Sequence, residues 1–199
     1  MKKPLIIGIT GGIGGGKSTF SNYLRQKGEL VYDTDLKAKY LQDNDKELIK
    51  RIKSKFGNDI YIEEKLDRKR LAKIVFSDAE KLKTLNSIVH PVVIDDFQKW
   101  IRSNSNRKFL FMECAILFEG GFHTLVDRIL VVTAPEPVRI KRVILRDNLT
   151  EDQVLARIKN QISETEKIHR ADWVFETNEN EFSTQEADEF LEMIYQMPN

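Results

Sequence analysis

The sequence lacks the features that mark secreted, zinc-stabilised or membrane-spanning proteins. Its one cysteine, Cys114, excludes an internal disulfide framework and is typical of a reducing cytoplasm. No apolar run approaches the roughly 20 residues that cross a bilayer, and the run 5–9 is too short for a signal-peptide core. The three histidines lack metal-ligand spacing. These absences predict a cytoplasmic protein.

An excess of charge of either sign is also missing, because 32 Lys and Arg residues nearly balance 31 Asp and Glu residues. Residues 174–199 contain acids but no Lys or Arg, so the body of the chain is basic. A basic body favours ligands rich in phosphate, although an acidic last helix on an ordinary surface explains the same distribution. Basic runs are not interleaved with aromatic residues, so we expect no nucleic-acid partner.

Strand and helix patterns alternate along most of the 199 residues. Apolar runs predict strands at 5–9, 30–32, 109–112, 128–132 and 172–177. Strands that alternate with helices predict an α/β fold with a doubly wound parallel sheet.

Residues 36–105 interrupt this alternation with a pattern that is helical throughout. The stretch is too long for a simple crossover, and we interpret it as an insertion that contacts substrate. One helix is expected from Asp78 to Pro91, with a break or kink near His90, because proline disfavours helical geometry in the residue before it.

A glycine-rich segment between the first strand and its helix fits the pattern G-x-x-x-x-G-K-[ST]. Glycines let backbone N–H groups turn inward around a phosphate, and the helix N-terminus adds positive potential. Lys17 can reach the β- and γ-phosphates, and the Ser18 hydroxyl can bind Mg²⁺. The residues expected to bind ATP are Gly12, Ile13, Gly14, Gly15, Gly16, Lys17, Ser18 and Thr19.

Motifs of the other nucleotide-dependent classes do not occur. The chain has neither the D-x-x-G nor the N-K-x-D motif of regulatory GTPases. The strand at 109–112 ends in Glu113-Cys114 rather than in the Asp-Glu pair usual in motor ATPases. The remaining class is phosphoryl transfer to a small molecule, in which the protein positions the acceptor and neutralises charge.

Carboxylates follow two of the predicted strands. Of Asp33 and Asp35, one could take the proton of an acceptor hydroxyl and the other could help hold Mg²⁺. The alternative is that both are turn or cap residues, since Asp is common before a helix. Glu113 could bind a water of Mg²⁺, or serve as a structural carboxylate facing the glycine loop.

A cluster of basic residues occupies the helix after the strand at 128–132, namely Arg139, Lys141, Arg142 and Arg146. Arg142 and Arg146 are four positions apart and therefore share a helix face. Arginines there can close over ATP and offset charge on the transferring phosphoryl group. The alternative is a solvated basic face.

Together these motifs resemble the dephospho-coenzyme A kinases across nearly the whole chain. The shared residues are 9–14, 16–19, Asp33–Asp35, 66–68, 74–76, 90–91, 117–119, 131–132, Pro135, Arg142, Arg146-Asp147, Arg157, Gln161, Lys167 and Asp172.

The resemblance implies a single P-loop kinase domain that transfers the γ-phosphate of ATP to the ribose 3′-hydroxyl of dephospho-CoA, with Mg²⁺. Its core is expected at about 1–35, 106–138 and 170–199, its CoA-binding insertion at about 36–105 and a mobile lid at about 139–169. The resemblance implies catalytic roles for Lys17 and Asp35, lid roles for Arg142 and Arg146, and substrate contacts for Arg70 and His90. We expect a monomer or weak homo-oligomer that acts on a small molecule.

The chain departs from the family pattern at three places. Glu113 and Ala115 stand where the family usually has an Asp and a Pro, and Gly15 stands where it usually has a Ser. The family's Asp-Asn-Ser/Gly-like turn near the C-terminus reads Glu-Thr-Asn-Glu at 176–179. These departures weaken the assignments of Glu113 and of the turn, but not of the function. Two alternatives to that function are a kinase for another nucleoside, nucleotide or sugar-like acceptor, and an ATP-binding regulatory protein without catalysis. Retention of Lys17, Ser18 and Asp35 argues against the last.

Overall fold

The computed structural model describes residues 3–178 and 182–197, in two compact units. The sheet unit comprises Met1–Tyr32 and Ser105–Asn199, and the helical unit comprises Asp33–Asn104. No helix within the described residues is long and apolar enough to cross a membrane.

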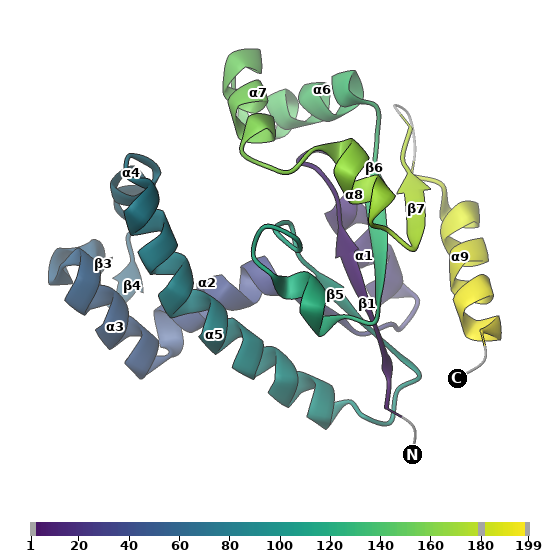
Figure 1. Ribbon diagram of the computed structural model, residues 1–199, viewed down its shortest axis with the longest axis horizontal. Helices are drawn as coiled ribbons and strands as arrows, with labels where there is room; N and C mark the ends of the chain where they lie inside the picture. The colour runs from purple at the N-terminus through teal and green to yellow at the C-terminus, as the bar shows by residue number, and fades with distance from the viewer. Residues whose placement is uncertain (1–2, 179–181, 198–199) are drawn as a thin grey trace. The chain divides into compact units, whose positions relative to one another are not determined.

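A five-stranded sheet forms the centre of the fold (Figure 1). Its strands, in the spatial order β2-β5-β1-β6-β7, are Val31–Asp33, Phe109–Glu113, Leu5–Thr10, Arg128–Thr133 and Trp173–Glu176. β1 pairs in parallel with both β5 and β6, and β6 pairs in parallel with β7. The predicted parallel α/β sheet is confirmed.

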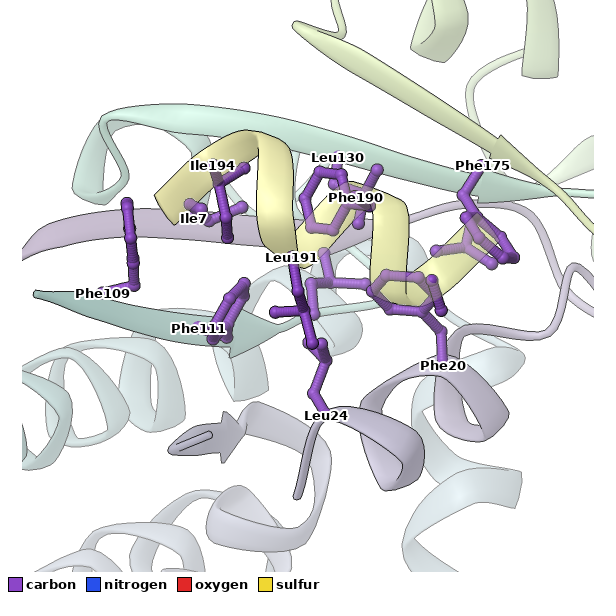
Figure 2. Close-up of a cluster of buried hydrophobic side chains, with 13 residues drawn as sticks. Ile7, Phe20, Leu24, Phe109, Phe111, Leu130, Phe175, Phe190, Leu191 and Ile194 are labelled. Carbon is purple, nitrogen blue, oxygen red and sulfur yellow. The ribbon is translucent and has the colours of Figure 1, made fainter. Parts of the chain in front are cut away.

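Two helices cover one face of this sheet and bury a common core. They are α1 (Lys17–Gln26) and α9 (Thr184–Gln196). Figure 2 shows Phe20 and Leu24 of α1 beside Phe190 of α9, packed against Ile7 and Phe111 of the strands. Burial of these large side chains holds α1 against the sheet, with its N-terminus at the end of the glycine loop.

Three further helices follow β6 in the sheet unit. They are α6 (Glu136–Asp147), α7 (Glu151–Lys159) and α8 (Glu164–His169). A short 3-10 helix, η2 (Phe122–Leu125), lies between β5 and β6.

The helical unit contains α2 (Thr34–Asn44), α3 (Lys46–Phe56), α4 (Arg68–Phe76), α5 (Ala79–Ser103) and a 3-10 helix, η1 (Asn58–Ile60). The expectation of helix throughout this region is wrong, because β3 (Tyr61–Ile62) and β4 (Lys65–Leu66) form an antiparallel hairpin. Its turn residues Glu63 and Glu64 have φ of 48° and 67°. A two-residue turn with positive φ is usually marked by Asn-Gly, so Glu-Glu carried no sequence signal.

The expected end of a helix at Pro91 is also wrong. α5 continues through Pro91 to Ser103, a run of 25 residues. Proline costs a helix about 3 kcal/mol through its missing N–H and its ring. Ile88, Val89, Val93 and Phe97 are buried on both sides of it, and burial of a large apolar side chain contributes roughly 1.5–3 kcal/mol each. Packing therefore outweighs the local cost.

Candidate active site

The glycine-rich loop adopts a conformation that only glycine permits at several positions, which include Gly14 and Gly16. Gly14 has φ of 81°, and a side chain there would meet the backbone of Arg139. Gly16 is the N-cap of α1 with φ of 97°, and an added Cβ would lie 3.1 Å from the Thr177 methyl group. The left-handed conformation and the lack of space explain both glycines. The loop therefore lies at the helix N-terminus, as a phosphate site requires.

Lys17 and Ser18 are both held by the loop and its neighbouring strand. Lys17 Nζ donates hydrogen bonds to the carbonyl oxygens of Gly11 and Gly12, at 2.8 and 3.2 Å. Ser18 Oγ donates to Oε1 of the buried Glu113 at 2.8 Å. Arg25 of α1 lies 3.7 Å from the other carboxylate oxygen. The sequence placed Glu113 at this edge of the sheet, and the structure brings it to the hydroxyl expected to bind Mg²⁺.

Of the two predicted lid arginines, Arg142 contacts the loop. Its Nη1 donates to Gly14 O at 3.3 Å and to Thr177 Oγ1 at 2.7 Å, and its Nη2 donates to Asn178 O at 2.6 Å. Thr177 and Asn178 belong to the turn after β7, whereas Glu179 lies outside the described residues. α6 therefore meets the phosphate loop through Arg142.

The other predicted lid arginine, Arg146, is directed elsewhere despite its i,i+4 spacing. Arg146 Nε and Nη2 donate to the carboxylate of the adjacent Asp147 at 2.8 and 3.0 Å. The hydrogen bond from Arg146 lowers the pKa of Asp147. Arg157 Nη1 also donates to this carboxylate, at 3.3 Å. Spacing along the helix did not determine where the two side chains point.

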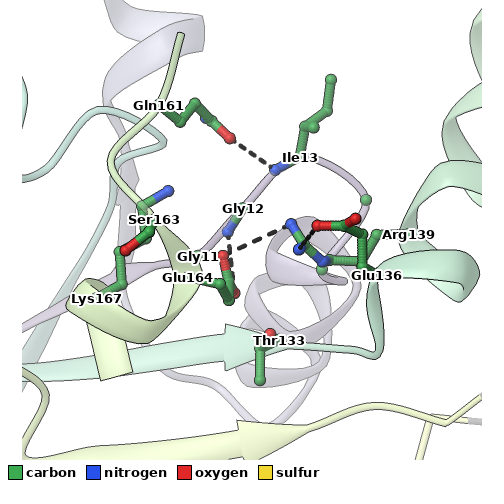
Figure 3. Close-up of polar contacts among 12 residues, drawn as sticks. Gly11, Gly12, Ile13, Thr133, Glu136, Arg139, Gln161, Ser163, Glu164 and Lys167 are labelled. Carbon is green, nitrogen blue, oxygen red and sulfur yellow. Dashed lines mark hydrogen bonds and ion pairs between the residues drawn. The ribbon is translucent and has the colours of Figure 1, made fainter. Parts of the chain in front are cut away.

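Two contacts at the loop were not predicted from the sequence. They come from Gln161, which precedes α8, and from Glu164, the first residue of α8 (Figure 3). Gln161 Oε1 accepts from the Ile13 N–H at 3.0 Å, and Glu164 Oε1 accepts from the Gly12 N–H at 3.3 Å. The buried Arg139 lies 3.6 Å from the Glu164 carboxylate. Arg139 was recognisable as one of a basic cluster, but nothing in the sequence pattern pointed to Glu164.

A buried lysine supports the same segment. Lys167 of α8 is fully buried, and its Nζ lies 3.8 Å from Oε1 of Glu119. Glu119 accepts the N–H of Ile162 at 3.1 Å. Burial lowers the pKa of Lys167, whereas the charges of Glu119 and Glu164 oppose that shift. These contacts hold segment 161–164 on the loop.

The carboxylates expected to serve the acceptor belong to the helical unit. Asp33 is the N-cap of α2 and accepts the Leu36 N–H at 2.9 Å. Asp35 lies in the first turn of the same helix and is exposed. The helix begins at Thr34, so Asp33 and Asp35 do not alternate along an extended strand. The role of each carboxylate stays a prediction.

The two other predicted substrate residues also belong to the helical unit. Arg70 of α4 pairs with Asp59 and donates to the Asp59 carbonyl at 3.1 Å. His90 of α5 is partly buried, and burial lowers its pKa. Both are placed on helices of the insertion, and substrate contact by either residue stays a prediction.

Known proteins with similar sequences are dephospho-CoA kinases. The family model of dephospho-CoA kinase matches residues 5–184. A dephospho-CoA kinase from Fusobacterium nucleatum is 42% identical over 177 residues, which are 88% of this chain and 91% of the relative.

Solved structures show the same architecture. A crystal structure from Thermus thermophilus superposes with a TM-score of 0.82 at 38% identity, covering 98% of this chain and 97% of that one. Shikimate kinase from Acinetobacter baumannii has a TM-score of 0.54 at 17% identity, covering 96% and 93%, and shares the P-loop kinase fold. With the phosphate loop formed and the match extending over both units, the chain belongs to the dephospho-CoA kinase family.

Proposed function

We propose that the chain transfers the γ-phosphoryl group of ATP to the ribose 3′-hydroxyl of dephospho-CoA, the last step of coenzyme A synthesis. The observation that carries this proposal is the family match over residues 5–184, which includes the phosphate loop and the helical unit. The enzyme would act in the cytoplasm on a small molecule, as a monomer or weak homo-oligomer, without nucleic acid or membrane.

The loop supplies positive potential for the donor. In a loop of this kind, backbone N–H groups at the start of the following helix bind the β-phosphate, and the helix N-terminus favours its charge. Lys17 rests on the carbonyls of Gly11 and Gly12 and would exchange these acceptors for phosphate oxygens. Arg142, already held beside Gly14, would neutralise further charge on the nucleotide.

The pair of Ser18 and Glu113 fits a magnesium ion, since Mg²⁺ takes oxygen ligands and keeps several waters. The Ser18 hydroxyl would ligate the ion and Glu113 would accept from its waters, while Asp33 is a second candidate for an outer contact. When bound, Mg²⁺ neutralises charge on the β- and γ-phosphates. The protein's own part is to hold the hydroxyl and the carboxylate in place, which Arg25 assists.

Glu113→Gln tests this role. The variant retains a side-chain oxygen for the Ser18 hydroxyl but loses the charge that orders magnesium waters. Outer-shell partners of metal ligands typically contribute about 10-fold to 100-fold in metal affinity. We expect the Mg²⁺ concentration at half-maximal rate to rise about tenfold, with kcat at saturating Mg²⁺ within about threefold. Asp188→Asn, which removes an exposed carboxylate paired with Lys27, should leave the magnesium titration unchanged. An unaltered titration for Glu113→Gln would make it a structural carboxylate.

The identity of the acceptor is the part of the proposed function that an activity assay tests most directly. ADP release with Mg-ATP should be measured for dephospho-CoA, AMP, adenosine and shikimate. We expect kcat/KM for dephospho-CoA to exceed the others by at least about a hundredfold, because the helical insertion offers contacts beyond a nucleoside. Comparable turnover of another acceptor would make the chain a different small-molecule kinase. ATP binding without turnover of any acceptor would make it a regulatory protein.

A further inference from the structure

The turn after β7 contains a buried hydroxyl at which three segments of the sheet unit meet. Thr177 is 3% exposed. Its Oγ1 lies within hydrogen-bond distance of Gly15 O in the phosphate loop, at 3.2 Å, and of Thr133 O at the end of β6, at 3.1 Å. Its backbone N–H also donates to Thr133 O, at 2.7 Å. The side chain is therefore fixed against both the strand end and the loop.

The same oxygen accepts a hydrogen bond from Arg142. Arg142 Nη1 donates to Thr177 Oγ1 at 2.7 Å, compared with 3.3 Å to Gly14 O. A hydroxyl has one proton and two lone pairs. With the proton directed to the carbonyl of Gly15 or Thr133, a lone pair is directed at the guanidinium. The orientation of the hydroxyl thus sets the position at which the guanidinium is held.

A second acceptor makes this contact directional. Arg142 Nη2 donates to Asn178 O at 2.6 Å, so two nitrogens of one planar group are held by adjacent residues of the turn. A planar fork bound at two points has a defined plane, which a single flexible contact would not give. The Thr177 methyl group occupies the space that a side chain at Gly16, the residue that caps α1, would need.

We infer that Thr177 is a positioning residue for the nucleotide, because its hydroxyl aims Arg142 at the phosphate loop. The inference rests on the proposed function in taking ATP as the ligand. It requires only a hydroxyl on a small side chain at this position.

Three variants separate this role from a packing role. Thr177→Val keeps the shape and removes the hydroxyl, Thr177→Ser keeps the hydroxyl and removes the methyl group, and Thr177→Ala removes both. Hydrogen bonds to charged groups account for roughly 10-fold to 100-fold in an equilibrium constant. We expect Thr177→Val and Thr177→Ala to weaken Mg-ATP binding, measured by titration calorimetry, by about tenfold or more. Thr177→Ser should remain within about threefold of wild type.

A double-mutant cycle with Arg142→Ala identifies the group through which Thr177 acts. If the hydroxyl works by aiming the guanidinium, Thr177→Val should weaken ATP binding by less than about threefold once Arg142 is already Ala. An undiminished effect in that background would show that Thr177 acts on the loop itself, and would overturn the inference. Equal binding by the Val, Ala and wild-type proteins would also overturn it.

Thermal unfolding of each variant shows whether a loss of binding is caused by a loss of folding. If Thr177→Val does not fold, the comparison of Thr177→Ser with Thr177→Ala decides, because they differ by the hydroxyl alone. Binding of Mg-ATP needs no acceptor, so the inference is tested even if the wild-type protein fails to phosphorylate dephospho-CoA. That failure would count against the proposed function and not against Thr177.

Discussion

Asp35→Asn should nearly abolish turnover while leaving ATP binding within about threefold of wild type. A carboxylate that takes the acceptor proton must come within about 2.6–3.2 Å of the hydroxyl, and its loss typically lowers kcat by 10²-fold to 10⁴-fold. Asn keeps the shape of Asp but neither takes the proton nor carries the charge. Asp35 lies in the first turn of α2 and is exposed. Steady-state rates and an ATP titration measure the two quantities separately.

Asp33→Asn is the matched control, and the structure gives it a sharper meaning. Asp33 caps α2 through the Leu36 N–H, and Asn caps a helix about as well as Asp. The variant should therefore keep the helix and cost much less in kcat than Asp35→Asn. An effect of Asp33→Asn should show as altered magnesium dependence. A dead Asp33→Asn beside an active Asp35→Asn would reverse the assignment of the base.

The core of the fold was predictable because its signals are local. The apolar run of β1, the glycines and Lys17-Ser18 specify strand, loop and helix within one short segment. Parallel pairing then follows from alternation of strands and helices. Because the carboxyl ends of parallel strands share one edge, Glu113 could be placed near the loop before its contact with Ser18 was seen.

The features that sequence reasoning missed depend on residues far apart in the chain. Continuation of α5 through Pro91 depends on which of its side chains are buried. The contact of Glu164 with the Gly12 N–H joins positions 152 residues apart, and no periodicity encodes such a pair. Spacing alone does not distinguish Arg142 from Arg146. The structure does, because Arg142 donates to Gly14, 128 residues away, whereas Arg146 pairs with the adjacent Asp147.

Arg146→Ala and Arg142→Ala should therefore have different kinetic effects. Arg142 contacts the loop itself, so its contribution is expected in ground state and transition state alike. Arg146 has a side chain that is 62% exposed and held by Asp147, and it must leave that partner to reach a phosphate. A contact made only in the transition state lowers kcat more than it raises KM.

We expect Arg146→Ala to lower kcat by roughly 10²-fold with KM for ATP within about threefold, in the range for charge-stabilising groups. Arg142→Ala should instead raise KM for ATP by about tenfold or more and lower kcat less. Lys141→Ala removes an exposed charge from the same helix and should behave as wild type. Steady-state kinetics with ATP varied at saturating dephospho-CoA distinguishes the three. If both arginine variants retain wild-type kcat and KM, this face of α6 is merely a solvated basic surface. If Arg146→Ala changes only KM, its contact with the nucleotide already exists in the ground state and lid closure adds nothing to it.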